Sequence, residues 1–499
     1  MTIQVSEDLL RAIATKDKAL SDGRTLSKKG AFKNMKVTKD ESLLWGQCQG
    51  SGAKPYELSI DLIGQNPTIR CTCPVKPPPC KHTLGFMVHY LEAKPKFAVA
   101  EPPPDLVEKR GKLQERAEKK AEDAAKPKEV NKEALAKKTK AQRDGLDLLE
   151  KLVADVAASG LGTITPKRAD NLKKQSRQLR DAYLPGAAVA LTRLAALADQ
   201  GDRGDDADGY DLFEPGDDLP DEQRHKLMAR HLTRLWAMVK RGKESLDEKL
   251  SEGESQDEAD AVVEDLLGKV WQYAELKGKG RVKTQTTFLE LAYERYDDES
   301  REERVEQGFL ADLSDGTLYS TLKYRPNAAL DRVTPQVSYE DVLEIAESVV
   351  YPGFTNRRIR WELASQRTRP ATHDDWRKLH AIALPDLGVA LTKFKEQIKN
   401  PLAPEEAVFL IRTQNIQRKD GEPVLVDEKG GRLLLRDSVI ARAHTTSNLV
   451  MAAGASLDNG KLKQPASVLV RLWLGLDDNV VMGQPLALVI GNSHIRLGM

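Results

Sequence analysis

Three of the chain's four cysteines lie close together with one histidine, and this cluster constrains the fold more than any other feature of the sequence. The four positions are Cys71, Cys73, Cys80 and His82, in the pattern Cys-x-Cys-x6-Cys-x-His. Four cysteines in 499 residues are too few for a disulfide framework. Thiolate and imidazole are common ligands of zinc in tetrahedral structural sites. The pattern therefore predicts one zinc ion held by these four side chains.

The predicted site is structural rather than catalytic. Cys71 and Cys73 can reach one ion from a tight turn, and a Pro-rich loop returns the chain to Cys80 and His82 at the start of a helix. Four protein ligands leave no open position for a reactive water. Cys48 stands apart and is interpreted as a core thiol on a strand.

The cluster and its flanking residues resemble the SWIM zinc finger of bacterial SWIM zinc finger family proteins. The resemblance covers roughly residues 20–100 and is carried by Trp45 to Gly52 (TrpGlyGlnCysGlnGlySerGly), Pro55-Tyr56 and Pro79 to His82. Weaker pieces follow at Tyr324 to Pro326 and at Arg357 to Glu362. One departure is Val75-Lys76, where the family often has Ser followed by Arg or Lys.

The resemblance implies two strands followed by a helix, with Cys71, Cys73, Cys80 and His82 as the ligands of one structural Zn²⁺. SWIM domains are generally assigned to DNA or protein binding, so the resemblance implies no substrate. Proteins of the resembled family are often encoded beside MoxR-type AAA+ ATPases and von Willebrand A proteins. This favours a role in a protein assembly.

The rest of the chain predicts a multidomain α+β protein. Residues 1–100 form the ββα zinc module, and residues 101–143 are rich in Lys, Glu and Ala, which is typical of a charged linker. Residues 144–280 carry helical apolar stripes, interrupted by an acidic loop at 199–222. Residues 281–499 form an α+β region that is strand-rich in its last hundred residues.

Three local patterns in the second half of the chain carry specific expectations. Asp315-Gly316 predicts the turn of a hairpin within residues 309–322. Ser338 is the expected cap of a helix through Val342, Ile345 and Val349. Strands are expected at 408–411, 424–426, 433–435, 468–474 and 486–490.

Charge separates the two leading function classes. Lys and Arg number 77 and Asp and Glu 76, so the formal net charge of +1 supplies no global attraction to nucleic acid. The strongest local patch is Arg357, Arg358, Arg360, Arg367 and Arg369, interleaved with Phe354 and Trp361. Nucleic-acid binding through the zinc module and this patch, chiefly Arg357, Arg358, Arg360 and Trp361, is therefore the alternative to protein recognition.

The favoured interpretation is a non-enzymatic recognition or adaptor protein with a protein partner. The sequence contains neither a G-x-S-x-G nor an H-E-x-x-H pattern, and no pair of carboxylates can be singled out for catalysis. The first ten residues contain acids and no apolar core of signal-peptide length, and no stretch has the composition of a membrane span. A cytoplasmic location is therefore expected, without membrane contact.

Overall fold

The computed structural model shows a mixed α/β chain whose described residues divide into two compact units. The described residues are 2–14, 17–50, 54–64, 67–75, 78–112, 115, 132–198, 220–252, 258–328, 338–438, 443, 445–455, 457–458, 461–477 and 479–498. The first unit comprises Met1–Asn131, Ala328–Ser348 and Trp361–Pro370. The second comprises Lys132–Asn327, Val349–Arg360 and Ala371–Met499.

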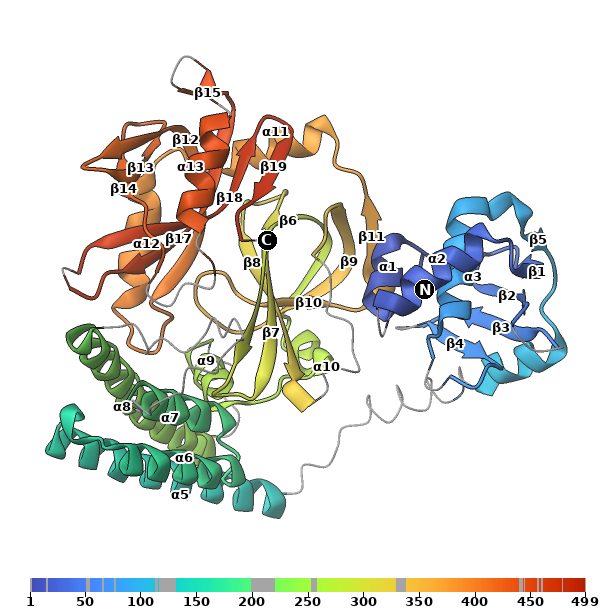
Figure 1. The fold of residues 1–499 in the computed structure, drawn as a ribbon. Helices are drawn as coiled ribbons and strands as arrows, with labels where there is room; N and C mark the ends of the chain where they lie inside the picture. Colours follow the sequence, from blue (N-terminus) through green and yellow to red (C-terminus); the bar gives the residue numbers. More distant parts are fainter. Residues whose placement is uncertain are drawn as a thin grey trace. The chain divides into compact units, whose positions relative to one another are not determined.

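The first unit is built on a five-stranded sheet in the order β4-β3-β2-β1-β5, drawn in blue in Figure 1. Its helices are α1 (Glu7–Ile13), α2 (Asp17–Lys28) and α3 (Lys81–Ala93), with the short turn η1 (Lys94–Lys96). Its strands are β1 (Phe32–Val37), β2 (Leu43–Cys48), β3 (Tyr56–Asp61), β4 (Thr68–Cys71) and β5 (Ala98–Val99). The predicted order of strand, strand, cluster and helix is present as β2, β3, cluster and α3, with β4 inserted before the cluster.

Helices α2 and α3 meet at two glycines. A Cβ atom on Gly85 would lie 2.6 Å from the carbonyl oxygen of Gly23, and a Cβ atom on Gly23 would lie 2.8 Å from the amide nitrogen of Gly85. Only glycine permits this backbone approach. The contact fixes α3, whose first turn carries His82, against α2 and the apolar core of the first unit.

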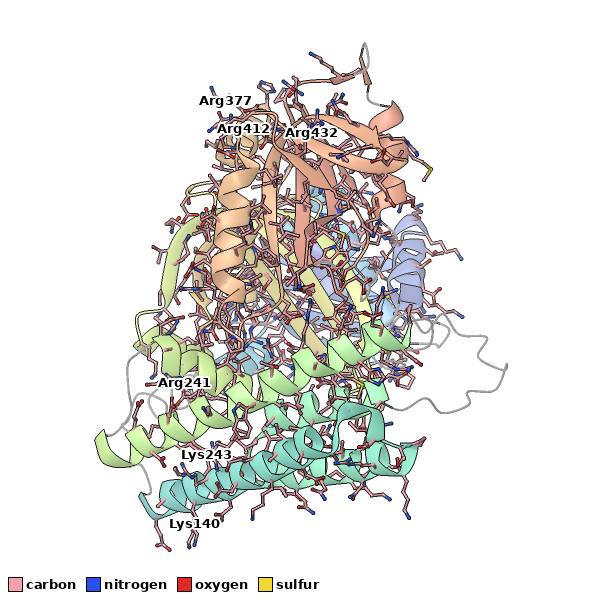
Figure 2. All side chains as sticks on the ribbon, turned by 90° about the vertical axis from the view of Figure 1, so that its left-hand side faces the viewer. Lys140, Arg241, Lys243, Arg377, Arg412 and Arg432 are labelled. Atoms are coloured by element: carbon pink, nitrogen blue, oxygen red, sulfur yellow. The ribbon has the colours of Figure 1, made fainter. Side chains whose placement is uncertain are left out.

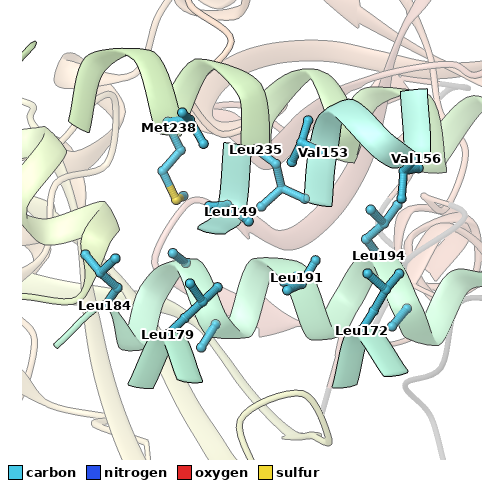
Figure 3. Close-up of a cluster of buried hydrophobic side chains, with 14 of the residues drawn as sticks. Leu149, Val153, Val156, Leu172, Leu179, Leu184, Leu191, Leu194, Leu235 and Met238 are labelled. Atoms are coloured by element: carbon cyan, nitrogen blue, oxygen red, sulfur yellow. The ribbon is translucent and has the colours of Figure 1, made fainter. Parts of the chain in front are cut away.

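The second unit begins with a helical region. Its helices are α5 (Lys132–Ser159), α6 (Pro166–Asp181), α7 (Pro185–Ala198), α8 (Asp221–Glu252), α9 (Glu258–Leu267) and α10 (Tyr273–Gly278), with η2 (Leu161–Thr163). The apolar stripes of α5 to α8 face one shared core, in which Leu149, Leu191 and Leu235 point toward one another (Figure 3). Thr165 caps α6, and Pro166 occupies its first turn, where a missing N–H costs nothing.

Strands dominate the rest of the second unit. Strands β6 (Val282–Asp298), β7 (Glu303–Asp312) and β8 (Leu318–Pro326) form an antiparallel meander. The predicted Asp315-Gly316 turn joins β7 to β8, with Gly316 at φ +76°. A second sheet has the order β14-β13-β12-β17-β18-β19 and contains all five expected strand segments.

The other helices and strands, apart from β9 and β11, have the following bounds. These are β10 (Ile359–Trp361), η4 (Leu363–Ser365), α11 (His373–Ile382), α12 (Leu387–Ile398), β12 (Glu406–Lys419), β13 (Glu422–Asp427), β14 (Arg432–Leu434), α13 (Thr445–Ala455), β15 (Leu457–Asp458), β16 (Lys461–Leu462), β17 (Ala466–Leu474), β18 (Val481–Ile490) and β19 (Ser493–Arg496). Side chains from α12 and α13 pack with the second sheet around Phe394, Leu449 and Leu488.

The prediction of a helix after Ser338 is wrong, because Val342–Val350 forms strand β9. This strand pairs antiparallel with β11 (Gln366–Arg369). Four of its nine residues are β-branched (Val342, Ile345, Val349 and Val350), a composition that favours strands. The spacing of its apolar residues also fits a helix. Val342 pairs with Arg369, 27 positions away, and local spacing in the sequence does not reveal this pairing.

The predicted acidic loop and the predicted charged linker can be compared with the structure only where their residues are described. The acidic loop at 199–222 lies mostly outside them, because only residues 220–222 are described there. Helix α5 begins at Lys132, inside the predicted linker, and residues 104–112 are also helical. Arg110 donates from Nε to Oδ2 of Asp61 at 2.9 Å and from Nη2 to Oδ1 at 3.0 Å. The first part of the predicted linker therefore docks on the sheet of the first unit.

Candidate metal centre

Two structural elements bring the four predicted ligands together. Cys71 is the last residue of β4, and Cys73 follows two positions later. Cys80 is the N-cap of α3, and His82 lies in its first turn. A strand end and a helix start thus converge, with the Pro-rich segment connecting them.

The four side chains form one compact, buried group. Their ligand atoms all lie within 4.8 Å of one another. The exposed fractions are 7% for Cys71, 1% for Cys73, 2% for Cys80 and 7% for His82. Three sulfurs and one imidazole nitrogen packed this closely, away from water, are the donor set expected of a structural metal site.

The distances fit the geometry of zinc. Tetrahedral bonds of about 2.3 Å to sulfur and about 2.05 Å to nitrogen place neighbouring sulfur and nitrogen ligands roughly 3.5 Å apart. The Sγ of Cys80 lies 3.6 Å from Nδ1 of His82, and the Sγ of Cys71 lies 4.0 Å from the same nitrogen. The residues present therefore fit one zinc ion bound through Nδ1 of His82, and the two positive charges of the ion would offset two of the three thiolate charges.

Hydrogen bonds around the cluster favour thiolate character at one ligand. The pKa of the Cys80 thiol is lowered to about 3, first by the hydrogen bond from the Cys71 thiol and then by His82 and Thr83. The backbone N–H of Cys73 points at the Sγ of Cys71, 3.4 Å away. A deprotonated sulfur is the form that binds metal.

Two residues that the sequence analysis did not assign to the metal site, Thr83 and Tyr56, contact the predicted ligands. The backbone N–H of Cys80 donates to Oγ1 of Thr83 at 3.0 Å, which completes a capping box at the start of α3. The ring of Tyr56 packs on that of His82, with centroids 4.8 Å apart. Cys80 and Thr83 differ from the usual capping-box sequence of Ser or Thr followed by Glu or Gln, and the Tyr56 contact depends on the register of β3, so neither contact could be found from the sequence.

Cys48 and His89 lie in the core of the first unit, outside the four-residue metal group. Cys48 is fully buried on β2, and burial raises the pKa of its thiol to about 11. His89 is buried, and its Nδ1 lies 3.0 Å from the hydroxyl of Ser27. A thiol kept protonated in an apolar setting is a poor ligand, which agrees with the prediction for Cys48.

The residues of the predicted nucleic-acid patch are divided between the two units. Arg357, Arg358 and Arg360 belong to the second unit, whereas Trp361, Arg367 and Arg369 belong to the first. The guanidinium of Arg358 lies over the ring of Tyr351, 3.5 Å from its centroid, and 3.9 Å from Asp265. Arg369 pairs with Glu344 at 2.7 Å, and Trp361 donates to Gln366 at 2.8 Å. Arg360 and Arg367 are exposed.

Other basic side chains of the second unit are spread over its surface and are largely compensated. Figure 2 shows Lys140, Arg241 and Lys243 on the helical region and Arg377, Arg412 and Arg432 at the opposite end of the unit. Lys243 pairs with Asp147 and Glu150, Arg241 with Glu244, Arg377 with Asp374 and Arg412 with Glu428. Such pairs reduce the field available to a phosphate backbone.

Comparison with known proteins gives no further assignment, because no family model, no curated protein and no solved structure matches this chain. No described helix combines the length and apolar composition that crossing a membrane requires. The structure thus establishes a mixed α/β protein with a Cys₃His cluster that could hold one metal ion, consistent with a zinc-finger module.

Proposed function

We propose that the chain is a SWIM-type, zinc-stabilised adaptor that recognises a protein partner and catalyses no reaction. The observation that carries the proposal is the closed donor set of Cys71, Cys73, Cys80 and His82. All four are buried, so a zinc ion bound there has a full coordination sphere and no position for a substrate or reactive water. Such an ion stabilises a recognition module instead of performing chemistry.

The surface near the cluster supports recognition. Val75, in the segment between Cys73 and Cys80, is 53% exposed, and Lys81 at the start of α3 is exposed as well. We place the contact with the partner at this apolar side chain, beside the proposed metal-bound turn. By its resemblance to SWIM family proteins, the partner is expected in a cytoplasmic assembly that contains a MoxR-type AAA+ ATPase and a von Willebrand A protein.

The experiment is a reconstitution with the AAA+ ATPase and von Willebrand A proteins of the same organism. We expect the full chain to co-elute with one of them in size-exclusion chromatography. Val75→Asp should weaken this complex at least tenfold while leaving zinc content unchanged, and Val107→Asp, at another exposed valine, should not. Full binding by Val75→Asp, or no complex with either protein, contradicts the proposal.

Nucleic-acid binding is the alternative function, and a separate titration with DNA tests it. The exposed Arg360 and Arg367 favour it, and the ion pairs of Arg358 and Arg369 oppose it. Under the adaptor proposal, duplex DNA binds no tighter than the nonspecific range of about 10⁻⁵ M at physiological salt. Submicromolar binding that falls steeply with salt, and disappears in an Arg357→Ala, Arg358→Ala, Arg360→Ala triple variant, would favour the alternative.

A further inference from the structure

A large cavity in the second unit lies outside the metal centre. Its volume is about 830 Å³, within the range of small-molecule sites. Its walls come from α9, the start of β6, the β7–β8 turn, the loop at 353–357, α12 and β12. Every lining residue belongs to the second unit, so the cavity is complete within one compact body.

The charge of the cavity is positive. Five basic side chains line it: Lys279, Arg281, Lys283, Arg357 and Lys393. Arg281 pairs with Glu258 at 2.6 Å, and Lys283 pairs with Asp312 at 2.6 Å and with Asp315 at 2.7 Å. Five cations against these three carboxylates leave two positive charges uncompensated. Among the described residues, no ion pair is formed by Lys279, Arg357 or Lys393.

The loop that carries Arg357 is held rigidly. Asn356 donates from Nδ2 to the carbonyl of Val408 at 2.9 Å, and the N–H of Val408 donates back to Oδ1 of Asn356 at 2.7 Å. Asn356 has φ +59°, a conformation that costs energy for a residue other than glycine. The N–H of Thr355 donates to Oε1 of Gln397 at 3.1 Å. A strained backbone fixed by side-chain clamps beside a cavity is a common property of binding sites.

The remaining wall combines polar residues, among them Thr317, Thr355 and Asn356, with apolar and aromatic ones. Phe354, Tyr319 and Phe409 line the cavity together with Leu318 and Leu384. A site with two unbalanced positive charges and an aromatic wall matches a ligand that has both a phosphate and a ring system. A phosphate monoester carries about −1.5 to −2 charges at neutral pH, which is the charge that the cavity lacks.

We propose that this cavity binds a nucleotide, with the phosphate at Arg357, Lys393 and Lys279 and the base against the aromatic wall. The proposal is independent of the metal centre, because no metal ligand lines the cavity. It gives the second unit a ligand-sensing role that the adaptor function does not require. Arginine and lysine provide the charge-assisted hydrogen bonds that phosphate oxygens accept.

Isothermal titration calorimetry of the full chain tests the proposal with AMP, GMP, CMP and UMP, and with adenosine and inorganic phosphate as partial probes. We expect at least one nucleotide to bind below 1 mM and at least tenfold tighter than either partial probe. The double variant Arg357→Glu, Lys393→Glu should lose at least tenfold in affinity. Arg377→Glu, a charge reversal at a 75% exposed site outside the cavity, should bind like the original chain.

Three results would overturn the proposal. The first is that none of the four nucleotides binds below 1 mM. The second is that inorganic phosphate binds as tightly as the nucleotides, since the aromatic wall would then contribute nothing. The third is unchanged affinity in the double variant. Because Arg357 and Lys393 are both exposed, their reversal should not unfold the protein, and a retained thermal transition verifies this.

Discussion

In the first unit the segment from Cys71 to His82 gathers three sulfurs and an imidazole nitrogen within 4.8 Å, whereas in the second unit helices α5 to α8 bury a continuous set of leucine, valine and alanine side chains. The three cysteines also belong to the apolar core of the first unit, so a metal bound there would add to packing that already exists. The helical region needs no ion, because its apolar stripes already face one another (Figure 3). The comparison teaches that both regions bury an apolar core and that, among the described residues, only the first unit adds a cluster able to hold a metal ion.

Removal of the metal should have the largest effect and should act on the first unit alone. Structural zinc contributes on the order of 10 kcal/mol to the folding of a small module. We therefore expect a strong chelator to expose the backbone of β4 and α3, while α5 to α8 keep their protection. Hydrogen exchange followed by mass spectrometry measures both regions in the same sample. Equal loss of protection in the helical region would break the comparison.

Truncation of a core leucine should have the converse effect. Leu191 on α7 is 1% exposed, and Leu191→Ala should lower the free energy of unfolding of the helical region by about 2–5 kcal/mol. Lys140→Ala on the exposed surface of α5 is the control and should change it by less than about 0.5 kcal/mol. Denaturant unfolding gives the difference, and zinc content should be the same in both variants. Loss of zinc in Leu191→Ala would show that the two units are not independent.

Acid should weaken the second unit through His231, a partly buried histidine on α8. Burial, and then the nearby Arg193 and Arg234, lower the pKa of His231 to about 4. Because the unfolded chain takes up the proton first, the stabilisation is complete above pH 6.5 and is lost as pH falls from 6.5 to about 4, by up to about 3 kcal/mol.

His231→Gln should flatten this pH dependence, measured as hydrogen-exchange protection of α8 between pH 7 and pH 4. His225→Gln, at an exposed position on the same helix, is the matched control. An unchanged pH slope in His231→Gln would contradict the assigned role of burial.

A smaller effect is expected where α2 and α3 touch. In Gly85→Ala the new Cβ would lie 2.6 Å from the carbonyl oxygen of Gly23, so the helices must separate. Such overpacking costs about 1–3 kcal/mol. In this variant the first unit should unfold at a lower denaturant concentration. The variant should retain its metal, because the four predicted ligands lie before Gly85 in the chain. Gly111→Ala, where no atom lies within 4 Å of the new Cβ, provides the control. Gly85→Ala with wild-type stability would show that the helix contact adjusts without cost.

The sequence predicts which four residues gather in one cluster but only part of the structure around them. Cys71, Cys73, Cys80 and His82 are close in sequence, so their spacing alone predicts a shared site. Strand β1 and helices α1 and α2 were not predicted, although α2 carries Gly23, whose contact with Gly85 exists only after folding. Strand β9 was misassigned because its pairing with β11 outweighs the apolar spacing of Val342, Ile345 and Val349.

The cavity of the second unit shows why some sites cannot be found in a sequence. Lys279, Arg357 and Lys393 come from three segments that are far apart along the chain, and each is an ordinary basic residue in its own segment. Arg357 was selected as part of a nucleic-acid patch from its neighbours in sequence. In the structure it lines a cavity with residues of β8 and β12 instead. Proximity in space, not local composition, defines this group.

Metal analysis of three purified proteins tests the central claim, that a closed Cys₃His site organises the first unit. By inductively coupled plasma mass spectrometry, the original chain should contain one zinc per molecule, and so should Cys48→Ala, which removes the buried thiol outside the cluster. Cys80→Ala should contain less than a tenth of that amount. Full zinc in Cys80→Ala, or no zinc in the original chain, would contradict the account.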